Sequence, residues 1–194
     1  MSGWVSKTPN DGDLMALTSE FDLHPIAVED AAHGHTRSKL EMFGDDLFMV
    51  ISTVSYVEHE ELTDTSEVVA TGQVMVFLGD HFVITVRRGE HAQLSALRRT
   101  MEADAARLAR GPSEVLYAIA DKIIDDYLDV VAEFEKDVDE IESRVFARGG
   151  QREVERVYQL KRELIEFKRC GLQTQPLVVG LAQVAVPDFA QRSG

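Results

Sequence analysis

The sequence predicts an α/β protein in which a head of sheet and helices is followed by a long helical hairpin. Strand-like runs are grouped between two sets of helical segments, an order that favours an α/β head. The stretch 113–146 contains no Gly or Pro and repeats apolar residues every three or four positions, which is the period of one helix face. We therefore expect a head at residues 1–110, a hairpin at 111–186 and a disordered tail at 187–194.

The head is expected to begin with one strand and two helices. Residues 3–6 are short, apolar and aromatic, and a turn at 10–13 can cap a helix that ends near Asp22. Pro25 suits the first position of a second short helix, which Gly34 ends. The segment Thr36–Phe43 is polar and then partly apolar, so we expect it to be a connection.

A group of strands is expected in the middle of the chain. Three runs at 47–57, 68–78 and 81–86 are rich in β-branched and aromatic residues. The Gly79-Asp80 pair between the last two is a hairpin turn signal, so these strands should be antiparallel. The acidic segment 58–67 is expected to be a loop, and 90–101 and 102–108 have helical periodicity.

The hairpin is expected to start with Ser113 as its N-cap and to turn at Gly149 and Gly150. The next stretch repeats apolar residues at the same spacing, and so short a link leaves room only for an antiparallel return. The first helix would be roughly 50 Å long, so part of it should project from the head. We expect the second helix to reach Ala185 at most, because Pro187 should end it.

Composition narrows the function classes. The formal charge of −14 argues against nucleic-acid binding through phosphates and suits divalent cations or a basic partner. The single cysteine, Cys170, excludes an intrachain disulfide framework and is expected to be a packing residue. The sequence shows no signal peptide and no membrane span, so we expect a soluble chain.

No pattern in the sequence indicates catalysis. It contains no Gly-x-Ser-x-Gly elbow, no phosphate-binding Gly-x-x-x-x-Gly-Lys loop and no Gly-x-Gly-x-x-Gly fingerprint. His33 and His35 flank Gly34 and are expected to be ordinary surface groups, not ligands of a transition metal. We therefore do not expect an enzyme.

Four carboxylates are candidate metal ligands. Asp121 and Asp125 share one face of the long helix near its apolar stripe, and like charges at that spacing repel unless something neutralises them. Glu29 lies beside Asp30 in the Pro25 helix. Mg²⁺ is often held by one or two carboxylates and retained waters, so such sites leave weak patterns. Solvated carboxylates are the alternative reading of the same residues.

Several ordered motifs resemble the CorA family of divalent-cation transporters. They are Leu-His-Pro-Ile-Ala-Val-Glu-Asp at 23–30, His-Thr-Arg-Ser-Lys-Leu-Glu at 35–41, Val-Phe-Leu-Gly-Asp-His-Phe-Val-Ile-Thr at 76–85, Leu-Tyr-Ala-Ile-Ala-Asp at 116–121, Asp-Asp-Tyr at 125–127 and Tyr-Gln-Leu-Lys-Arg-Glu-Leu at 158–164. The resemblance runs from Gly3 to about Leu181. It implies an α/β/α sandwich head with a mostly antiparallel mixed sheet, and it identifies the hairpin as the family's two willow helices.

The resemblance also implies a function. The family's head and willow helices form a pentameric funnel on the cytoplasmic face of the inner membrane, and divalent cations between neighbouring subunits favour the closed channel. By motif, its cation-binding carboxylates fall on Glu29, Asp30 and Asp121. The expected cation is Mg²⁺, with Co²⁺, Ni²⁺ and Zn²⁺ as other divalent ions, and the expected partner is the chain itself.

Departures from the family pattern limit this expectation. The Gly-Met-Asn pore triplet, the membrane helices and the stalk helix with its partner carboxylate have no counterpart in the sequence. We therefore expect a fragment that senses cations or assembles subunits and does not conduct ions by itself. We expect this fragment to be linked to the membrane only through the missing C-terminal helices. A zinc-transporting branch of the superfamily and a purely structural oligomerisation scaffold are the alternatives.

Overall fold

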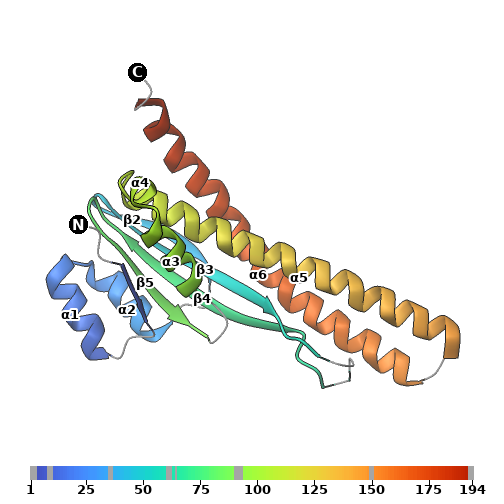
Figure 1. The fold of residues 1–194 in the computed structure, drawn as a ribbon. Helices are drawn as coiled ribbons and strands as arrows, with labels where there is room; N and C mark the ends of the chain where they lie inside the picture. Colours follow the sequence, from blue (N-terminus) through green and yellow to red (C-terminus); the bar gives the residue numbers. More distant parts are fainter. Residues whose placement is uncertain are drawn as a thin grey trace.

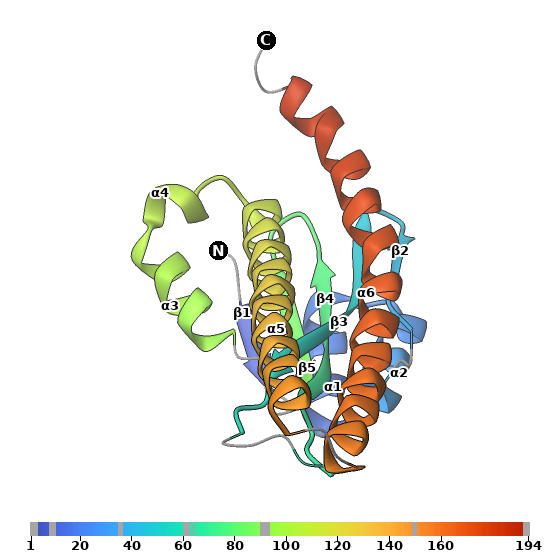
Figure 2. The same cartoon turned by 90° about the vertical axis from the view of Figure 1, so that its right-hand side faces the viewer.

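The computed structural model describes residues 4–7, 11–34, 37–59, 63, 65–89, 94–148 and 151–191, and it has a three-layer head with a long helical hairpin (Figure 1). A five-stranded sheet forms the middle layer, in the order β1-β5-β4-β3-β2. Helices α1 and α2 cover one face of the sheet, while α3 and α5 cover the other (Figures 1 and 2). The predicted α/β/α class is confirmed.

The sheet is mixed and mostly antiparallel, as expected. Its centre is the long pair β3 (Asp46–Tyr56) and β4 (Val69–Leu78), which is antiparallel along its whole length. Strand β5 (Val83–Arg88) and strand β2 (Lys39–Phe43) pair antiparallel to β4 and β3. Only β1 (Trp4–Lys7), at the edge beside β5, is parallel to its neighbour among the described strands.

Alternate residues of the central strands fill two separate cores. In β3, Met49 and Ile51 point to the layer that contains α5, whereas Phe48 and Val50 point to the layer of α1 and α2. All four side chains are fully buried. Because side chains alternate along a strand, one strand supplies both cores, and a one-residue slip would exchange them.

The two N-terminal helices lie where the sequence predicts them. Helix α1 spans Asp11–Phe21 and helix α2 spans Pro25–His33. Pro25 occupies the first turn of α2, where its missing N–H costs no helical hydrogen bond. Gly34 follows with φ 79°, a left-handed conformation that glycine adopts without strain.

The C-terminal half is helical. The short helices α3 (Ser95–Ala103) and α4 (Ala105–Leu108) lead into α5 (Pro112–Arg148), and α6 (Gln151–Gln191) runs back along it. The predicted hairpin is confirmed, although α5 begins at Pro112, so the expected N-cap Ser113 lies inside the first turn. The expected turn glycines at 149–150 lie outside the described residues, as do 90–93 of the expected helix before α3.

The hairpin is joined to the head by a third apolar cluster. Its residues come from the far end of the β3–β4 pair and from both long helices: Val54, Val68, Val69, Val130, Phe134, Ile141, Leu160 and Cys170. Phe134 and Phe167 contact each other across the hairpin, with ring centroids 5.6 Å apart. The Tyr127 hydroxyl donates to the Ser52 carbonyl (3.1 Å) and lies 3.1 Å from the Thr174 hydroxyl. Burial raises the pKa of Tyr127 to about 12, so the phenol stays protonated.

Two sequence expectations are corrected. The segment 39–43 is not a connection but strand β2. Its side chains are all half-buried or exposed and include Lys39 and Glu41, so the sequence shows no clear alternation of apolar and polar residues there. Helix α6 does not end before Pro187 but continues to Gln191, and it also passes through Pro176. A proline removes one helical hydrogen bond and strains one turn, but the turns after it can still form their own bonds. Residues 187–191 of the expected disordered tail are therefore helical, and 192–194 lie outside the described residues.

None of the helices, over the part of the chain that the structure describes, has an apolar stretch long enough to cross a membrane.

Candidate metal site and polar pocket

The Asp30 carboxylate on α2 already binds a cation of the chain itself. Lys39 of β2 places its Nζ 2.6 Å from Asp30 Oδ2 and 2.6 Å from Glu41 Oε2. The side chains of Asp30 and Lys39 are each 19% exposed, so this pair is only partly screened by solvent. A divalent cation at Asp30 would therefore compete with the Lys39 ammonium.

The electrostatics of Lys39 follow from these contacts. Burial lowers the pKa of Lys39, but hydrogen bonds and charges from Asp30 and Glu41 outweigh burial and hold the pKa above its ordinary value. The Nζ atom also lies 5.5 Å from the centre of the Phe48 ring, within the range of a cation–π contact. Lys39 thus stays charged at neutral pH. Sequence reasoning missed this residue.

The other three predicted ligands are exposed. Glu29 lies beside Asp30 on α2, and its backbone carbonyl is 3.0 Å from His33 Nδ1. Asp121 and Asp125 lie one turn apart on α5, on the side turned away from the buried residues Ile119 and Ile123. Within the described ranges, neither aspartate makes an ion pair. Their solvated carboxylates are free to accept a cation or a basic partner.

The structure does not bring the predicted ligands together in one chain. Helix α2 packs on one face of the sheet and α5 packs on the other, so Asp30 and Asp121 are separated by the sheet (Figure 2). Across the residues that the structure describes, no three His, Cys, Asp or Glu side chains converge as a metal site would require. His35, the partner of His33 in the histidine pair, lies outside the described residues.

One acidic group was not singled out from the sequence. Asp46, at the start of β3, has its pKa raised by burial and then by the charges of Asp80, Asp45 and Asp22. Asp45 belongs to the β2–β3 turn, which Asp46 follows as the first residue of β3, and Asp80 belongs to the β4–β5 turn. Leu47 pairs with Leu78, so the two turns lie at the same end of the sheet. The sequence indicates both turns, but it does not indicate that they lie side by side. That follows only from the pairing of β3 with β4.

A buried carboxylate anchors α5 to the end of β3. The Tyr56 hydroxyl donates to Asp137 Oδ1 and Oδ2 at 3.0 and 3.2 Å, and His59 Nε2 lies 3.5 Å from Oδ1. Burial raises the pKa of Asp137, although the Tyr56 hydrogen bond and the His59 charge lower it. Burial and the bond to Asp137 also raise the pKa of Tyr56. The group is an attachment point for the hairpin, because its partners come from both parts.

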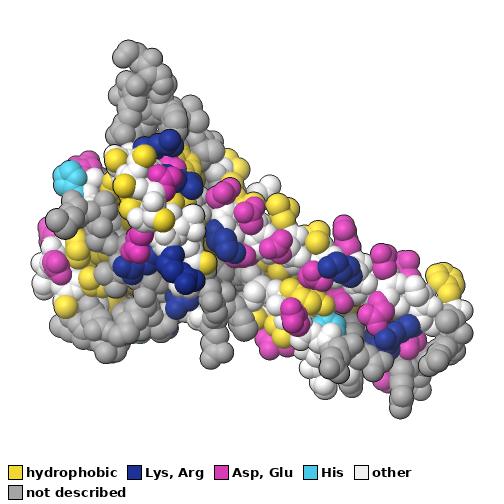
Figure 3. Space-filling view, in the orientation of Figure 1, with side chains coloured by type: hydrophobic (Ala, Val, Ile, Leu, Met, Phe, Trp, Pro, Cys, Tyr) yellow, Lys and Arg dark blue, Asp and Glu magenta, His cyan; other side chains and the backbone are white. Residues whose placement is uncertain are grey.

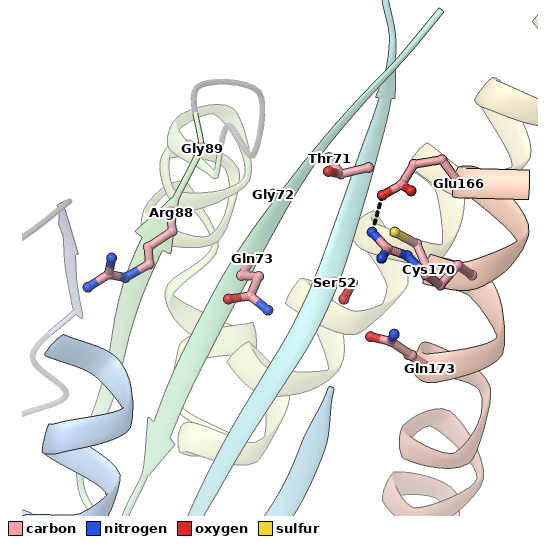
Figure 4. A pocket seen from close by; sticks show the side chains of 10 residues that line it. Ser52, Thr71, Gly72, Gln73, Arg88, Gly89, Glu166, Cys170 and Gln173 are labelled. Carbon is pink, nitrogen blue, oxygen red and sulfur yellow. Dashed lines mark hydrogen bonds and ion pairs between the residues drawn. The ribbon is translucent and has the colours of Figure 1, made fainter. Parts of the chain in front are cut away.

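A cavity of about 350 Å³ lies between the sheet and α6 (Figure 4). Ser52 and Gln73 line it from the strands, and Cys170 and Gln173 line it from α6. Burial raises the pKa of the Cys170 thiol, which keeps it protonated and a poor nucleophile. The expectation that Cys170 is a packing residue agrees with its place in the apolar cluster at the hairpin.

The arginines beside this cavity are already engaged. Arg88 points away from Gln73 in Figure 4, and its guanidinium donates to the carbonyls of Ala31 and Ala32 at the end of α2. Arg169 pairs with Glu166 on its own helix. Among the described residues that line it, the cavity therefore offers hydroxyl and amide groups but no uncompensated cation that would hold a phosphate.

Known proteins are similar to this chain over almost its whole length. Residues 4–191 match the family model described as "CorA-like Mg2+ transporter protein". The cobalt/magnesium transport protein CorA of Thermotoga maritima is 28% identical over 174 residues, which cover 86% of this chain and 46% of the relative. The magnesium transporter ALR1 of Saccharomyces cerevisiae is 26% identical over 184 residues, covering 95% of this chain and 20% of the relative. The chain thus spans half or less of these relatives.

Solved structures share the fold. The complete CorA magnesium transporter from Methanocaldococcus jannaschii superposes with a TM-score of 0.73 at 16% identity, over 92% of this chain and 54% of that chain. The ZntB cytoplasmic domain from Vibrio parahaemolyticus superposes with a TM-score of 0.53 at 10% identity, over 98% of this chain and 87% of that one. The match of the family model over residues 4–191 establishes that the chain belongs to the family of CorA-like Mg²⁺ transporter proteins.

Proposed function

We propose that this chain is the cytoplasmic Mg²⁺-sensing and subunit-assembly domain of a CorA-like transporter, and that it catalyses no reaction. Divalent cations would bind between copies, with Glu29 and Asp30 supplied by one copy and Asp121 and Asp125 by the next. Bound cations would hold the copies together and favour the closed channel. In the intact transporter the copies would form a ring, with the domain on the cytoplasmic face of the membrane.

One observation carries this proposal. The carboxylates of α2 and α5 belong to the two outer layers of the head and are separated by the sheet. A cation that uses both sets must therefore lie between two copies. The exposed Asp121 and Asp125 repel each other until a cation or a basic group neutralises them. Mg²⁺ suits such a site because it keeps several waters and needs few protein ligands.

The experiment compares thermal melting and sedimentation of the wild type in EDTA and in rising MgCl₂, at constant ionic strength. A ligand that binds only the folded or assembled state raises stability with its concentration. We expect Mg²⁺ to stabilise or associate the wild type and to have little effect on the double variant Asp30→Asn, Asp121→Asn. CoCl₂, NiCl₂ and ZnCl₂ series would rank the ions.

The matched control is Asp129→Asn, Asp139→Asn, which removes the same charge from α5 outside the predicted site. It should respond to Mg²⁺ like the wild type. An equal response of all three proteins would assign the effect to general screening and reject the predicted ligands. Absence of any response in the wild type would leave a structural scaffold as the function of this chain.

A further inference from the structure

The last turn of α2 is held by a side chain from the sheet. The final carbonyl groups of a helix have no partner within the helix itself. In α2 the Asp30 carbonyl accepts from the Gly34 N–H at 2.9 Å. The Arg88 guanidinium of β5 donates to the Ala31 carbonyl from Nε at 3.3 Å and from Nη2 at 3.0 Å, and Nη2 also donates to the Ala32 carbonyl. We call this contact the α2 clamp.

Arginine suits the α2 clamp by shape and by charge. Its planar fork can donate to two carbonyl groups at once, whereas a lysine ammonium is a compact point charge. Its positive charge lies at the negative end of the helix dipole. Arg88 is half-buried, so water competes only in part for the carbonyl groups. The α2 clamp therefore depends on the guanidinium group.

Close approaches on two sides fix the position of Arg88. A Cβ on Gly72 would lie 2.7 Å from the Arg88 carbonyl oxygen, and a Cβ on Gly89 would lie 3.1 Å from the Gly72 Cα. Strands β4 and β5 are thus packed tightly at the residue that carries the guanidinium. On the other side, a Cβ on Gly34 would lie 3.2 Å from Arg88 Cδ. Gly34 therefore leaves the space that the Arg88 side chain needs to reach α2.

The α2 clamp acts on the turn that carries two predicted metal ligands. Glu29 and Asp30 directly precede Ala31, whose carbonyl accepts from the guanidinium. Helix α2 has nine residues, and helices of this length are marginal without tertiary contacts. Ala27 and Ala31 are buried in the core between α2 and the sheet. This packing and the α2 clamp together fix the rotation of the helix and hence the direction of both carboxylates.

The direction of these carboxylates matters because the surface proposed to face them is also acidic. Figure 3 shows acidic side chains spread along the hairpin, and α5 carries the predicted ligands Asp121 and Asp125. Two acidic surfaces repel each other unless a cation lies between their carboxylates. A metal site also needs its ligands held within about 0.5 Å of the productive geometry. A loose last turn of α2 would therefore weaken cation binding.

We propose that Arg88 is a positioning residue for the proposed cation site. It touches no cation and acts through the backbone of α2, by holding Glu29 and Asp30 in the direction that a cation between two copies requires. Lys39 acts differently, because it binds the Asp30 carboxylate itself. The inference rests on the proposed function and assigns a role to a residue outside the four predicted ligands.

Thermal melting in rising MgCl₂ at constant ionic strength tests the inference with Arg88→Met, which keeps a long side chain and removes the fork. Loss of a group that orients a metal ligand typically lowers metal affinity about 10–100-fold. We therefore expect the MgCl₂ concentration that gives half of the full Mg²⁺ effect, the half-point, to rise about tenfold. Arg88→Lys keeps the charge at the helix end without the fork and should recover only part of the loss.

Two controls separate positioning from net charge and from general stability. Arg98→Met removes an exposed arginine that pairs with Glu102 on α3. Leu160→Ala opens the buried cluster at the hairpin and lowers stability outside α2. Both should keep the half-point of the wild type, although Leu160→Ala should melt at a lower temperature.

Gly34→Ala perturbs the α2 clamp from the other side. Its Cβ would press on the Arg88 side chain, and alanine is strained at φ 79°. This variant should also raise the half-point. In the Arg88→Met background it should raise the half-point little further, because changes that act through one contact do not add. Fully additive effects would overturn the α2 clamp as the common cause.

Amide hydrogen exchange in EDTA tests the α2 clamp without any cation. Arg88→Met should speed exchange in the last turn of α2, and unchanged exchange there overturns the inference. If the wild type responds to MgCl₂ and Arg88→Met keeps the same half-point, the inference fails while the proposed function stands. If the wild type does not respond at all, the proposed function fails and the inference falls with it.

Discussion

Lys39 is the residue whose contacts bear most directly on the predicted metal site, because it already binds Asp30. Its ammonium bridges Asp30 and Glu41, so the carboxylate that the family motif assigns to a cation holds an internal cation in this structure. A bound Mg²⁺ would have to displace this ammonium or share Asp30 with it. Lys39 thereby sets how strongly a divalent cation competes for Asp30.

Replacing Lys39 tests this competition. Lys39→Met should lower the free energy of unfolding in EDTA by about 1 kcal/mol, because a partly exposed pair is lost and two carboxylates are left near each other. The same variant should gain more stability from MgCl₂ than the wild type does. Lys122→Met, which removes the Asp126 pair on α5, is the matched control. An unchanged Mg²⁺ response in Lys39→Met would show that the ammonium does not compete.

Asp137 predicts a pH dependence of stability. Its folded pKa is raised, so the carboxyl contributes stability at pH values below its unfolded pKa, and this contribution is lost as pH rises through the folded pKa. Asp137→Asn keeps an acceptor for Tyr56 and does not titrate. Urea unfolding should therefore show that the free energy of unfolding of the variant increases relative to that of the wild type as pH rises. The increase should begin at about pH 4, which is near the ordinary pKa of an aspartate.

The neighbouring charges define the control for this measurement. His59 faces Asp137, and Glu133 and Glu140 of α5 also act on it. His59 Nε2 lies 3.5 Å from Asp137 Oδ1, so the comparison is repeated with His59→Gln in both backgrounds. A stability difference that does not change with pH in that background would contradict the assignment to Asp137.

The sequence located the candidate ligands but not their surroundings. The positions of Asp30 and Asp121 on helices follow from local patterns, and both helices are present. The Lys39 contact depends on the pairing of β2 with β3, which is a long-range event that local periodicity does not encode. The assignment of all four carboxylates to metal remains a prediction.

At the scale of elements, two glycines have opposite roles. A Cβ on Gly72 of β4 would lie 2.7 Å from the Arg88 carbonyl oxygen and 2.9 Å from Thr53 Oγ1, whereas a Cβ on Gly180 of α6 would meet nothing within 4 Å. Gly72→Ala should cost about 1–3 kcal/mol because the β4–β5 backbone must shift. Gly180→Ala should gain about 0.5–1 kcal/mol because alanine favours the helix. Urea unfolding of both variants measures the difference, and equal effects would contradict the close approach at Gly72.

Element prediction succeeded where the pattern is long. Helix α5 has an uninterrupted apolar period over 37 residues, and its bounds were expected within a few positions. The edge strand β2 has five residues, and it is recognisable only beside β3. The predicted end of α6 is wrong because Pro187 and Pro176 both lie within the helix, whereas local pattern predicts that a proline ends one.

At the scale of the whole molecule, head and hairpin share a core. Val115, Leu116 and Ile119 of α5 pack with the strands, and Leu177 and Leu181 of α6 belong to the same cluster. The division at residue 111 remains a prediction about organisation, since this cluster joins both sides of it. The chain belongs to the family of CorA-like Mg²⁺ transporter proteins and spans half or less of the relatives compared, so its action within a larger transporter belongs to the proposed function.

The hydrogen bonds between α6 and the start of β4 have a mechanical consequence. Glu163 accepts from the backbone N–H groups of Val68 and Val69 at 3.0 and 3.2 Å, and Gln159 donates to the Ser66 carbonyl. These hydrogen bonds attach α6 of the hairpin to the chain at the start of β4. Because these hydrogen bonds join α6 to the start of β4, we expect a force applied at the tip of the hairpin to tilt the sheet, with the long helices moving as one stiff body about this joint.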